Sequence, residues 1–251
     1  MNPRTPLALL IGSLFAAHVA TADPLPPVSA AEAGFSAEGL ARINKFFDRE
    51  TQANRVPGAV VAIARDGKLV HYKAYGHLDK SKGQPMPMDA IFALASMTKI
   101  MTSVAALQLT QEGRLPLKSQ LSDYYPEFAS MKVGVPLADG SLRLDPQVRP
   151  IFVQDLFRHT SGLTYGGRGD HPVSKLYPND TQPALTGGTG ELIDRLTKLP
   201  LAHQPGTVFE YSFSTDVLGA VVEKVSGQSL GERLQAQVWT PLAMVDRRCQ
   251  V

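Results

Sequence analysis

The sequence predicts an α+β protein in which a helix covers two antiparallel strands and a series of further helices follows. Three observations support this: an amphipathic helical pattern over residues 35–52, two apolar β-branched runs within residues 57–75, and a series of helical patterns from residue 96 to residue 238. With 251 residues, of which 43% are hydrophobic and 19% charged, the chain can bury a substantial core. We expect a Pro-rich linker at residues 23–34 and one domain over residues 35–251.

The first helix is expected over residues 35–52. Ser36 is a favourable N-cap residue, and Leu40, Ile43 and Phe47 follow at helical spacing on one side. A one-sided apolar stripe of this kind more often covers a sheet than binds a separate partner. We therefore expect this helix to pack against the strands that follow it.

Two strands are expected at residues 57–65 and 69–75, joined by Asp66 and Gly67. Asp-Gly is a favoured two-residue hairpin turn because glycine tolerates the positive φ that the turn requires. A two-stranded hairpin is marginal by itself and needs further strands or a covering helix. We find no clear pattern for further strands in the rest of the sequence.

A long helix is expected from Ser96 to about Gln111, where Gly113 supplies a stop. Its middle offers few polar positions, which predicts a helix that is buried on most sides. Gly227 and Ser229 are expected to end one later helix and to begin the next. The remaining helical patterns cover residues 155–158, 191–199, 217–225 and 229–238.

Residues 1–22 have the features of a secretory signal peptide. Arg4 supplies a positive start, residues 7–20 form an apolar core, and Ala20-Thr21-Ala22 is a small-residue cleavage site. The apolar core is too short for a permanent membrane-spanning helix, and an uncleaved N-terminal anchor is the alternative to a cleaved signal. We expect a periplasmic or secreted protein without a stable membrane span.

Charge and composition exclude several classes of function. The formal net charge is +2 and the basic residues are dispersed, which argues against a nucleic-acid groove or a polybasic membrane patch. The single Cys249 excludes an internal disulfide framework, and the six histidines show no zinc-ligand spacing. We therefore expect no metal, no other cofactor, and a small-molecule substrate as partner.

The candidate active centre is Ser96, which is followed three residues later by Lys99. Residues i and i+3 share one face of a helix, so the lysine amine can reach the serine hydroxyl and act as its base. The positive end of the helix dipole also favours an oxyanion that forms at Ser96. The spacing alone is weak, because chance supplies roughly 0.7 such pairs in this composition; an N-capping serine beside a solvated lysine is the plain alternative.

A stretch rich in Gly, Pro, Asn, Asp and Thr covers residues 165–190. Long ordered loops in compact domains are usually functional, so this segment is a candidate wall of a substrate pocket, with Tyr165 as a candidate substrate contact. A surface insertion without function is an equally good interpretation. Its Gly187-Gly188-Thr189-Gly190 run lacks the Lys-Ser/Thr pair of a phosphate-binding loop.

Several motifs occur together in a fixed order over residues 35–244: Ser96-Met97-Thr98-Lys99, His159-Thr160-Ser161-Gly162-Leu163, Pro205-Gly206 followed by Tyr211-Ser212, and Asp216-Val217-Leu218-Gly219 running to Gly227. In this order they resemble the serine hydrolases related to class C β-lactamases, a group with carboxylesterases, D-aminopeptidases and penicillin-binding D,D-peptidases. The resemblance implies the β-lactamase and penicillin-binding-protein fold, an α+β fold in which an antiparallel sheet is flanked by helices and joined to a mostly helical subdomain.

The resemblance also implies roles for single residues. It makes Ser96 the acylated nucleophile and its backbone N–H an oxyanion donor, Lys99 the base, and Tyr211 a second proton-transfer group whose phenol oxygen approaches Ser96. Phe213 stands where the β-lactamases usually have an amide residue. Because phenylalanine cannot hydrogen-bond a β-lactam side-chain amide, this substrate contact favours esters over lactams.

The family's third motif, a Lys/His/Trp-x-Gly strand with a second oxyanion donor, is expected after the last helices and is not found before Val251. We therefore expect the C-terminal strands of the fold to be missing from this chain. Removal of one oxyanion donor elsewhere costs about 2.7–4 kcal/mol, which predicts slow activity at best.

Gly227-Gln228-Ser229-Leu230-Gly231 matches the nucleophile elbow of α/β-hydrolases. That elbow needs a strand before the serine and a later histidine, whereas here a helix precedes it and the last histidine is His203. We reject Ser229 as a nucleophile. Three hypotheses stay open: an exported esterase, a β-lactamase or D,D-peptidase of the same fold, and a fragment or binding module without turnover.

Overall fold

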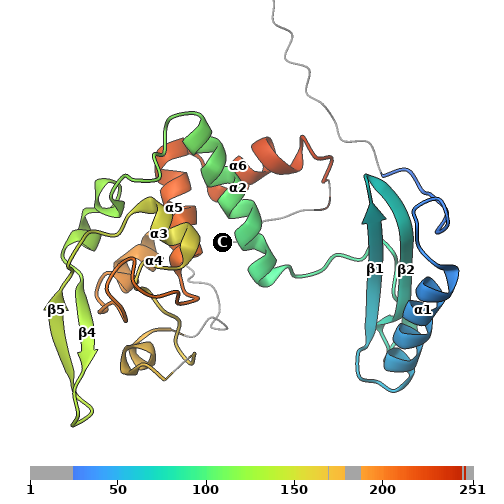
Figure 1. Ribbon diagram of the computed structural model, residues 1–251, viewed down its shortest axis with the longest axis horizontal. Helices are drawn as coiled ribbons and strands as arrows, with labels where there is room; N and C mark the ends of the chain where they lie inside the picture. The colour runs from blue at the N-terminus through green and yellow to red at the C-terminus, as the bar shows by residue number, and fades with distance from the viewer. Residues whose placement is uncertain (1–24, 169, 179–187, 245, 247–251) are drawn as a thin grey trace, which may run out of the picture.

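The computed structural model describes residues 25–168, 170–178, 188–244 and 246. Figure 1 shows two regions: α1 with the β1–β2 hairpin at one end of the molecule, and a helical body around α2 and α5 at the other. Residues 86–94 join them. The predicted signal peptide and the first two residues of the linker lie outside the described residues, as does most of the predicted loop between residues 178 and 188.

The first region begins with α1 (Ala37–Gln52). The Ser36 hydroxyl accepts a hydrogen bond from the N–H of Gly39 at 2.9 Å, which confirms the predicted N-cap. Phe47 stacks on Tyr75 of the second strand with ring centroids 5.1 Å apart, so the helix covers the hairpin as expected. The cover is incomplete, because Phe46 stays 46% exposed.

The hairpin consists of β1 (Gly58–Arg65) and β2 (Lys68–Asp79), paired antiparallel with Arg65 opposite Lys68. Asp66 and Gly67 have φ values of 49° and 69°, and positive φ at both central residues is the requirement of a type I′ turn. The predicted hairpin is confirmed. A short third strand, β3 (Gln84–Pro85), pairs with the end of β2.

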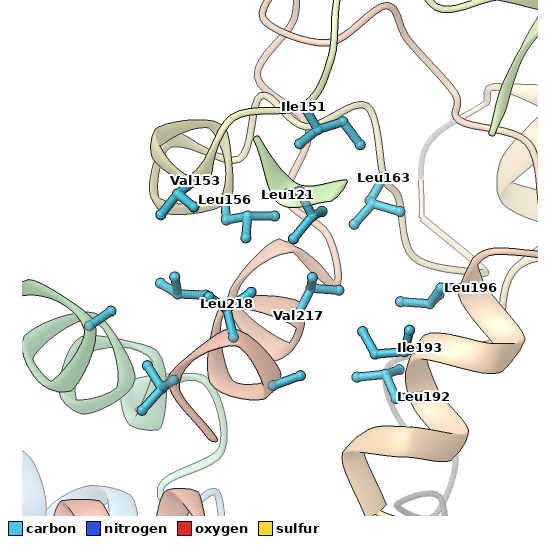
Figure 2. Packing of buried hydrophobic residues seen from close by; sticks show 14 of the residues in the cluster. Leu121, Ile151, Val153, Leu156, Leu163, Leu192, Ile193, Leu196, Val217 and Leu218 are labelled. Carbon is cyan, nitrogen blue, oxygen red and sulfur yellow. The ribbon is translucent and has the colours of Figure 1, made fainter. Parts of the chain in front are cut away.

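The helical body is built around α5 (Ser214–Ser226), which packs against α2 (Thr98–Gln111) and α3 (Val153–Arg158). Val217 and Leu218 of α5 are fully buried. Figure 2 shows side chains from several segments gathered around α5. Those labelled in the view are Leu121, Ile151, Val153, Leu156, Leu163, Leu192, Ile193 and Leu196.

The remaining helices complete this body. Gly227 has a φ of 75° at the end of α5, and Ser229 caps α6, so the predicted stop and start are confirmed. The other segments are α4 (Gly188–Leu196), α6 (Leu230–Leu234), the 3₁₀ turns η1 (Ala95–Met97), η2 (Leu121–Asp123), η3 (Pro126–Ala129) and η4 (Pro172–Leu176), and the π turn η5 (Gln235–Trp239).

The prediction that the α2 helix is buried on most sides is wrong. Its buried residues face α5 and α6, whereas Ile100 is 69%, Val104 39% and Leu107 48% exposed. These three residues follow each other at i, i+4 and i+7, so they form one apolar face that the described residues leave open to solvent. The α2 helix therefore has few polar residues because one of its apolar faces lies in the core and another lies open to solvent.

The prediction of no further strands is also wrong. Besides β3, a second hairpin joins β4 (Lys132–Pro136) to β5 (Leu142–Pro146) in antiparallel register. The backbone of β4 continues into the helical body, because the Gly134 N–H donates to the Leu201 carbonyl at 2.8 Å. Both strands are five residues long and end in proline, and β4 also contains Gly134, so each gives only a weak strand pattern. Within the described residues, no helix combines the length and apolarity that crossing a membrane requires.

Candidate active site

Ser96 lies in the 3₁₀ turn η1, immediately before α2, and its side chain is exposed. Ala95 precedes it with a φ of 44°, the left-handed region that a residue with a Cβ atom rarely adopts. Such strained residues cluster at functional sites. The first N–H groups of a helical turn lack partners within the turn, so the Ser96 N–H is suited to the oxyanion role that was predicted for it.

Tyr211 contacts Ser96 directly. Its hydroxyl donates a hydrogen bond to the Ser96 Oγ at 2.6 Å, which joins two residues 115 positions apart in the sequence. The Tyr211 segment is fixed on both sides by His159: the Glu210 N–H donates to the His159 carbonyl at 2.8 Å, and the Ser212 N–H donates to His159 Nδ1 at 3.2 Å. The phenol is therefore held where a proton can pass to or from Ser96.

Lys99 lies in the first turn of α2, and its Nζ is 5.3 Å from the centroid of the Tyr211 ring. The helical spacing predicts a direct contact between Lys99 and Ser96, which the described residues do not show. Lys99 Nζ instead donates a hydrogen bond to the Tyr165 hydroxyl at 3.1 Å. The reason is geometric, because Ser96 lies in a 3₁₀ turn and not within the α-helix itself. Lys99 therefore lies against the Tyr211 ring, and its hydrogen bond goes to Tyr165.

Tyr165 and Phe213 were predicted as substrate contacts. The Tyr165 side chain is only 3% exposed, and its hydroxyl donates to Asp216 Oδ2 at 2.9 Å while it accepts from Lys99. Phe213 stands at the N-cap of α5 and meets the Tyr165 ring edge-on at 4.3 Å between centroids. The Tyr165 ring lies 5.7 Å from that of Tyr211, and Phe213 packs behind it against Tyr165. The role of both side chains toward substrate stays a prediction.

His159 belongs to the site although the sequence motif assigned it no role. It ends α3 with a φ of 54°, and its ring lies 4.9 Å from that of Tyr211. Burial, and next to it the positive charge of Lys99, lower the pKa of His159, while Asp216 opposes the shift. Because Nδ1 accepts the Ser212 N–H, the ring proton of the neutral form is on Nε2, 3.3 Å from Thr215 Oγ1.

Asp216 is the second residue of the site to which the sequence assigned no role. Its Oδ2 lies 3.8 Å from Lys99 Nζ, and it occupies the first turn of α5. An acid in the first turn of a helix is common because it interacts favourably with the helix dipole. For that reason the sequence pattern alone could not distinguish it from an ordinary first-turn acid.

Ser229 is placed apart from this constellation. Its Oγ donates to the Glu232 carboxylate at 2.7 Å and accepts from the Glu232 N–H at 3.2 Å, a capping box between α5 and α6. A helix precedes it, as expected, and the described residues place no strand there. Among the residues that the structure describes, no cluster of three histidine, cysteine or acidic side chains could hold a metal ion.

The antiparallel hairpins and the helical body around α5 form a mixed α+β fold, which comparison with solved structures identifies as the β-lactamase and penicillin-binding-protein type. The solved structure of EstCE1, "a hydrolase with promiscuous acyltransferase activity", matches it with a TM-score of 0.67 and 29% identity, over 81% of this chain and 51% of that one. The family model described as Beta-lactamase matches residues 43–248. The chain therefore belongs to the beta-lactamase family, the relationship that its motifs had indicated.

Two curated relatives share much of the sequence. Esterase EstB of Burkholderia gladioli is 36% identical over 209 residues, which are 82% of this chain and 50% of the relative. Lovastatin esterase of Penicillium rubens is 34% identical over 204 residues, which are 80% of this chain and 50% of the relative. The chain spans about half the length of these curated relatives.

Proposed function

We propose that the protein is an exported serine hydrolase, a carboxylesterase that cleaves small acyl esters through an acyl-enzyme on Ser96. The hydrogen bond from Tyr211 to Ser96, with Lys99 beside the tyrosine ring, is the observation that carries the proposal. Names of relatives add support, because EstB and the lovastatin enzyme are both called esterases. Phe213, which offers no amide, favours an ester over a β-lactam.

The mechanism begins when the Ser96 oxygen attacks the ester carbonyl carbon. With the proton that Tyr211 and Lys99 share held on Lys99, the Tyr211 oxygen accepts the hydroxyl proton of Ser96, and the negative charge that develops on the carbonyl oxygen faces the Ser96 N–H. Collapse of this intermediate breaks the bond to the alcohol, which leaves with the proton from the pair. Water, activated by the same pair, then cleaves the acyl–Ser96 bond and releases the acid.

Two substrates test the reaction class. We expect measurable hydrolysis of p-nitrophenyl butyrate, less of a chromogenic cephalosporin, and none of the ester by Ser96→Ala. Ser229→Ala is the matched serine control and should retain the wild-type rate. Faster turnover of the cephalosporin would move the assignment to a β-lactamase, and equal ester hydrolysis by Ser96→Ala would remove the proposed nucleophile.

Export is part of the same proposal and rests on residues 1–22. Cleavage after Ala22 would leave a mature protein that begins at Asp23. N-terminal sequencing of protein from the periplasmic or culture fraction tests this, since recovery only of the intact N-terminus in the cytosol would contradict it.

A further inference from the structure

Three groups form a continuous hydrogen-bonded chain behind the proposed nucleophile. Lys99 Nζ donates to the Tyr165 hydroxyl at 3.1 Å, and that hydroxyl donates to Asp216 Oδ2 at 2.9 Å. The same carboxylate oxygen lies 3.8 Å from Lys99 Nζ, within ion-pair distance. Asp216 therefore acts on Lys99 both directly and through a phenol.

This arrangement constrains the position of the Lys99 amine. A lysine side chain has four rotatable carbon bonds and samples many positions unless its amine is held. The Lys99 side chain is only 20% exposed, so a charged amine there benefits from a nearby opposite charge. His159 also packs against Tyr211, but its lowered pKa favours the neutral ring and neither of its forms carries a negative charge, so it cannot fill that role.

An alternative is that Asp216 only stabilises the first turn of α5. The α6 helix offers a comparison, because Glu232 occupies its first turn and bonds its own N-cap, Ser229. Asp216 instead points its carboxylate at Tyr165, 51 positions away in the sequence, and at Lys99 on a different helix. Helix capping requires neither contact.

We propose that Asp216 is a positioning residue that holds the Lys99 amine beside Tyr211, acting in part through the hydroxyl of Tyr165. The inference rests on the proposed function, since it concerns the rate at which Ser96 is acylated. Without the carboxylate, the amine leaves its position near Tyr211, and proton transfer from Ser96 slows. The expected loss lies mainly in the rate of proton transfer, because the carboxylate faces Lys99 and the hydroxyl end of Tyr165.

The test uses a fluorophosphonate ester that labels Ser96, with the maximal labelling rate and the half-saturating probe concentration measured separately on the full chain. Asp216→Ala should lower the maximal rate about 10- to 100-fold, the usual cost of a misplaced catalytic group, with little change in half-saturation. Tyr165→Phe should give a smaller loss, because the direct Lys99–Asp216 contact remains. Asp216→Asn keeps the side-chain shape and should behave like Asp216→Ala.

Chemical rescue separates positioning from structure. Formate supplied to folded Asp216→Ala should restore part of the labelling rate, because a small carboxylate can occupy the vacated space beside Lys99. Glu232→Gln, the matched first-turn acid of α6, should lose stability without losing labelling rate.

The outcomes distinguish the two proposals. A wild-type labelling rate in folded Asp216→Asn would overturn the positioning role while the esterase proposal stands. The same conclusion would follow if Asp216→Ala labelled slowly, formate did not restore its rate, and Glu232→Gln labelled just as slowly. Failure of the folded wild-type protein to label at Ser96 would overturn both.

Discussion

The helical body and the α1–hairpin region differ in how completely they bury their apolar side chains. In the body, α5 alone contributes Val217, Leu218 and Val221 at 0% exposure. In the hairpin region, α1 has no buried residue. The buried aromatic side chain of this region is Tyr75 of β2, which is 4% exposed. The well-formed core therefore lies on the side of the molecule that holds the candidate site.

The site follows the same division. Tyr211, His159, Tyr165 and Asp216 all belong to the helical body, and Ser96 joins them from the turn before α2. The hairpin region contributes no side chain to these contacts among the described residues. We infer that the proton-transfer half of the proposed site is organised by the body, whose rigid core fixes its geometry.

The largest expected effect is on chemistry. Tyr211→Phe should lower the rate of Ser96 acylation by about 10²- to 10⁴-fold, because it removes the proton-transfer group that contacts the nucleophile. Tyr75→Phe is the matched change in the other region, where the hydroxyl donates to Asn44. Labelling kinetics with a fluorophosphonate measure both variants, and equal rates for the two would break the assignment of chemistry to the body.

The next largest effect is on stability. Leu218→Ala should cost about 2–5 kcal/mol, since it leaves a cavity in a fully buried position. Phe46→Ala in α1 should cost about 1 kcal/mol, because the side chain is already 46% exposed. Urea unfolding followed by circular dichroism compares them, and a larger loss for Phe46→Ala would reverse the contrast between the two regions.

A pH effect of smaller size is expected from His159. Its pKa is lowered from the ordinary 6.5 by burial and by Lys99, so the folded state binds fewer protons than the unfolded state below that value. The stability contributed by the neutral ring is complete above pH 6.5 and is lost as the pH falls toward the folded-state pKa. Burial and the neighbouring His203 also lower the pKa of His171, so His171 adds a contribution of the same sign.

The free energy of unfolding is measured between about pH 7.5 and about pH 5, a range that contains the ordinary histidine pKa. In His159→Gln, the free energy of unfolding should depend less steeply on pH than in the wild-type protein. The dependence that remains comes from His171. An unchanged slope in this variant would show that the His159 ring does not resist protonation in the fold.

The smallest expected effects come from one helix cap in each region. Ser36→Ala and Ser229→Ala each remove a side-chain acceptor from an N-terminal turn, at a cost of about 1 kcal/mol. Neither change should alter the acylation rate of Ser96. Thermal unfolding and labelling kinetics check this, and a loss of labelling in Ser229→Ala alone would revive the nucleophile-elbow interpretation.

Much of the fold could be predicted because its signals are local. Ser36, Asp66-Gly67 and Gly227-Ser229 act through neighbouring backbone groups, and the structure places each of them as expected. The β4–β5 hairpin could not be predicted, because its strands are short and one of them is held by Leu201, far along the chain. The exposed face of α2 was missed because an apolar helix pattern does not say which neighbours are present.

The candidate site divides in the same way. Ser96 and Lys99 share a local motif, and Tyr211 follows from the ordered resemblance, so all three could be named from the sequence. The roles of Asp216 and His159 could not, since they depend on contacts with Tyr165 and Ser212 at 51 and 53 positions of separation. Such contacts arise only when the helical body has folded.

The proposed function depends above all on acylation of Ser96. Its most direct test is mass spectrometry of the peptides from folded protein treated with a fluorophosphonate ester. We predict a single adduct on Ser96, formed far more slowly in Tyr211→Phe. An adduct on Ser229, or no adduct on Ser96 in protein that is demonstrably folded, would contradict the account.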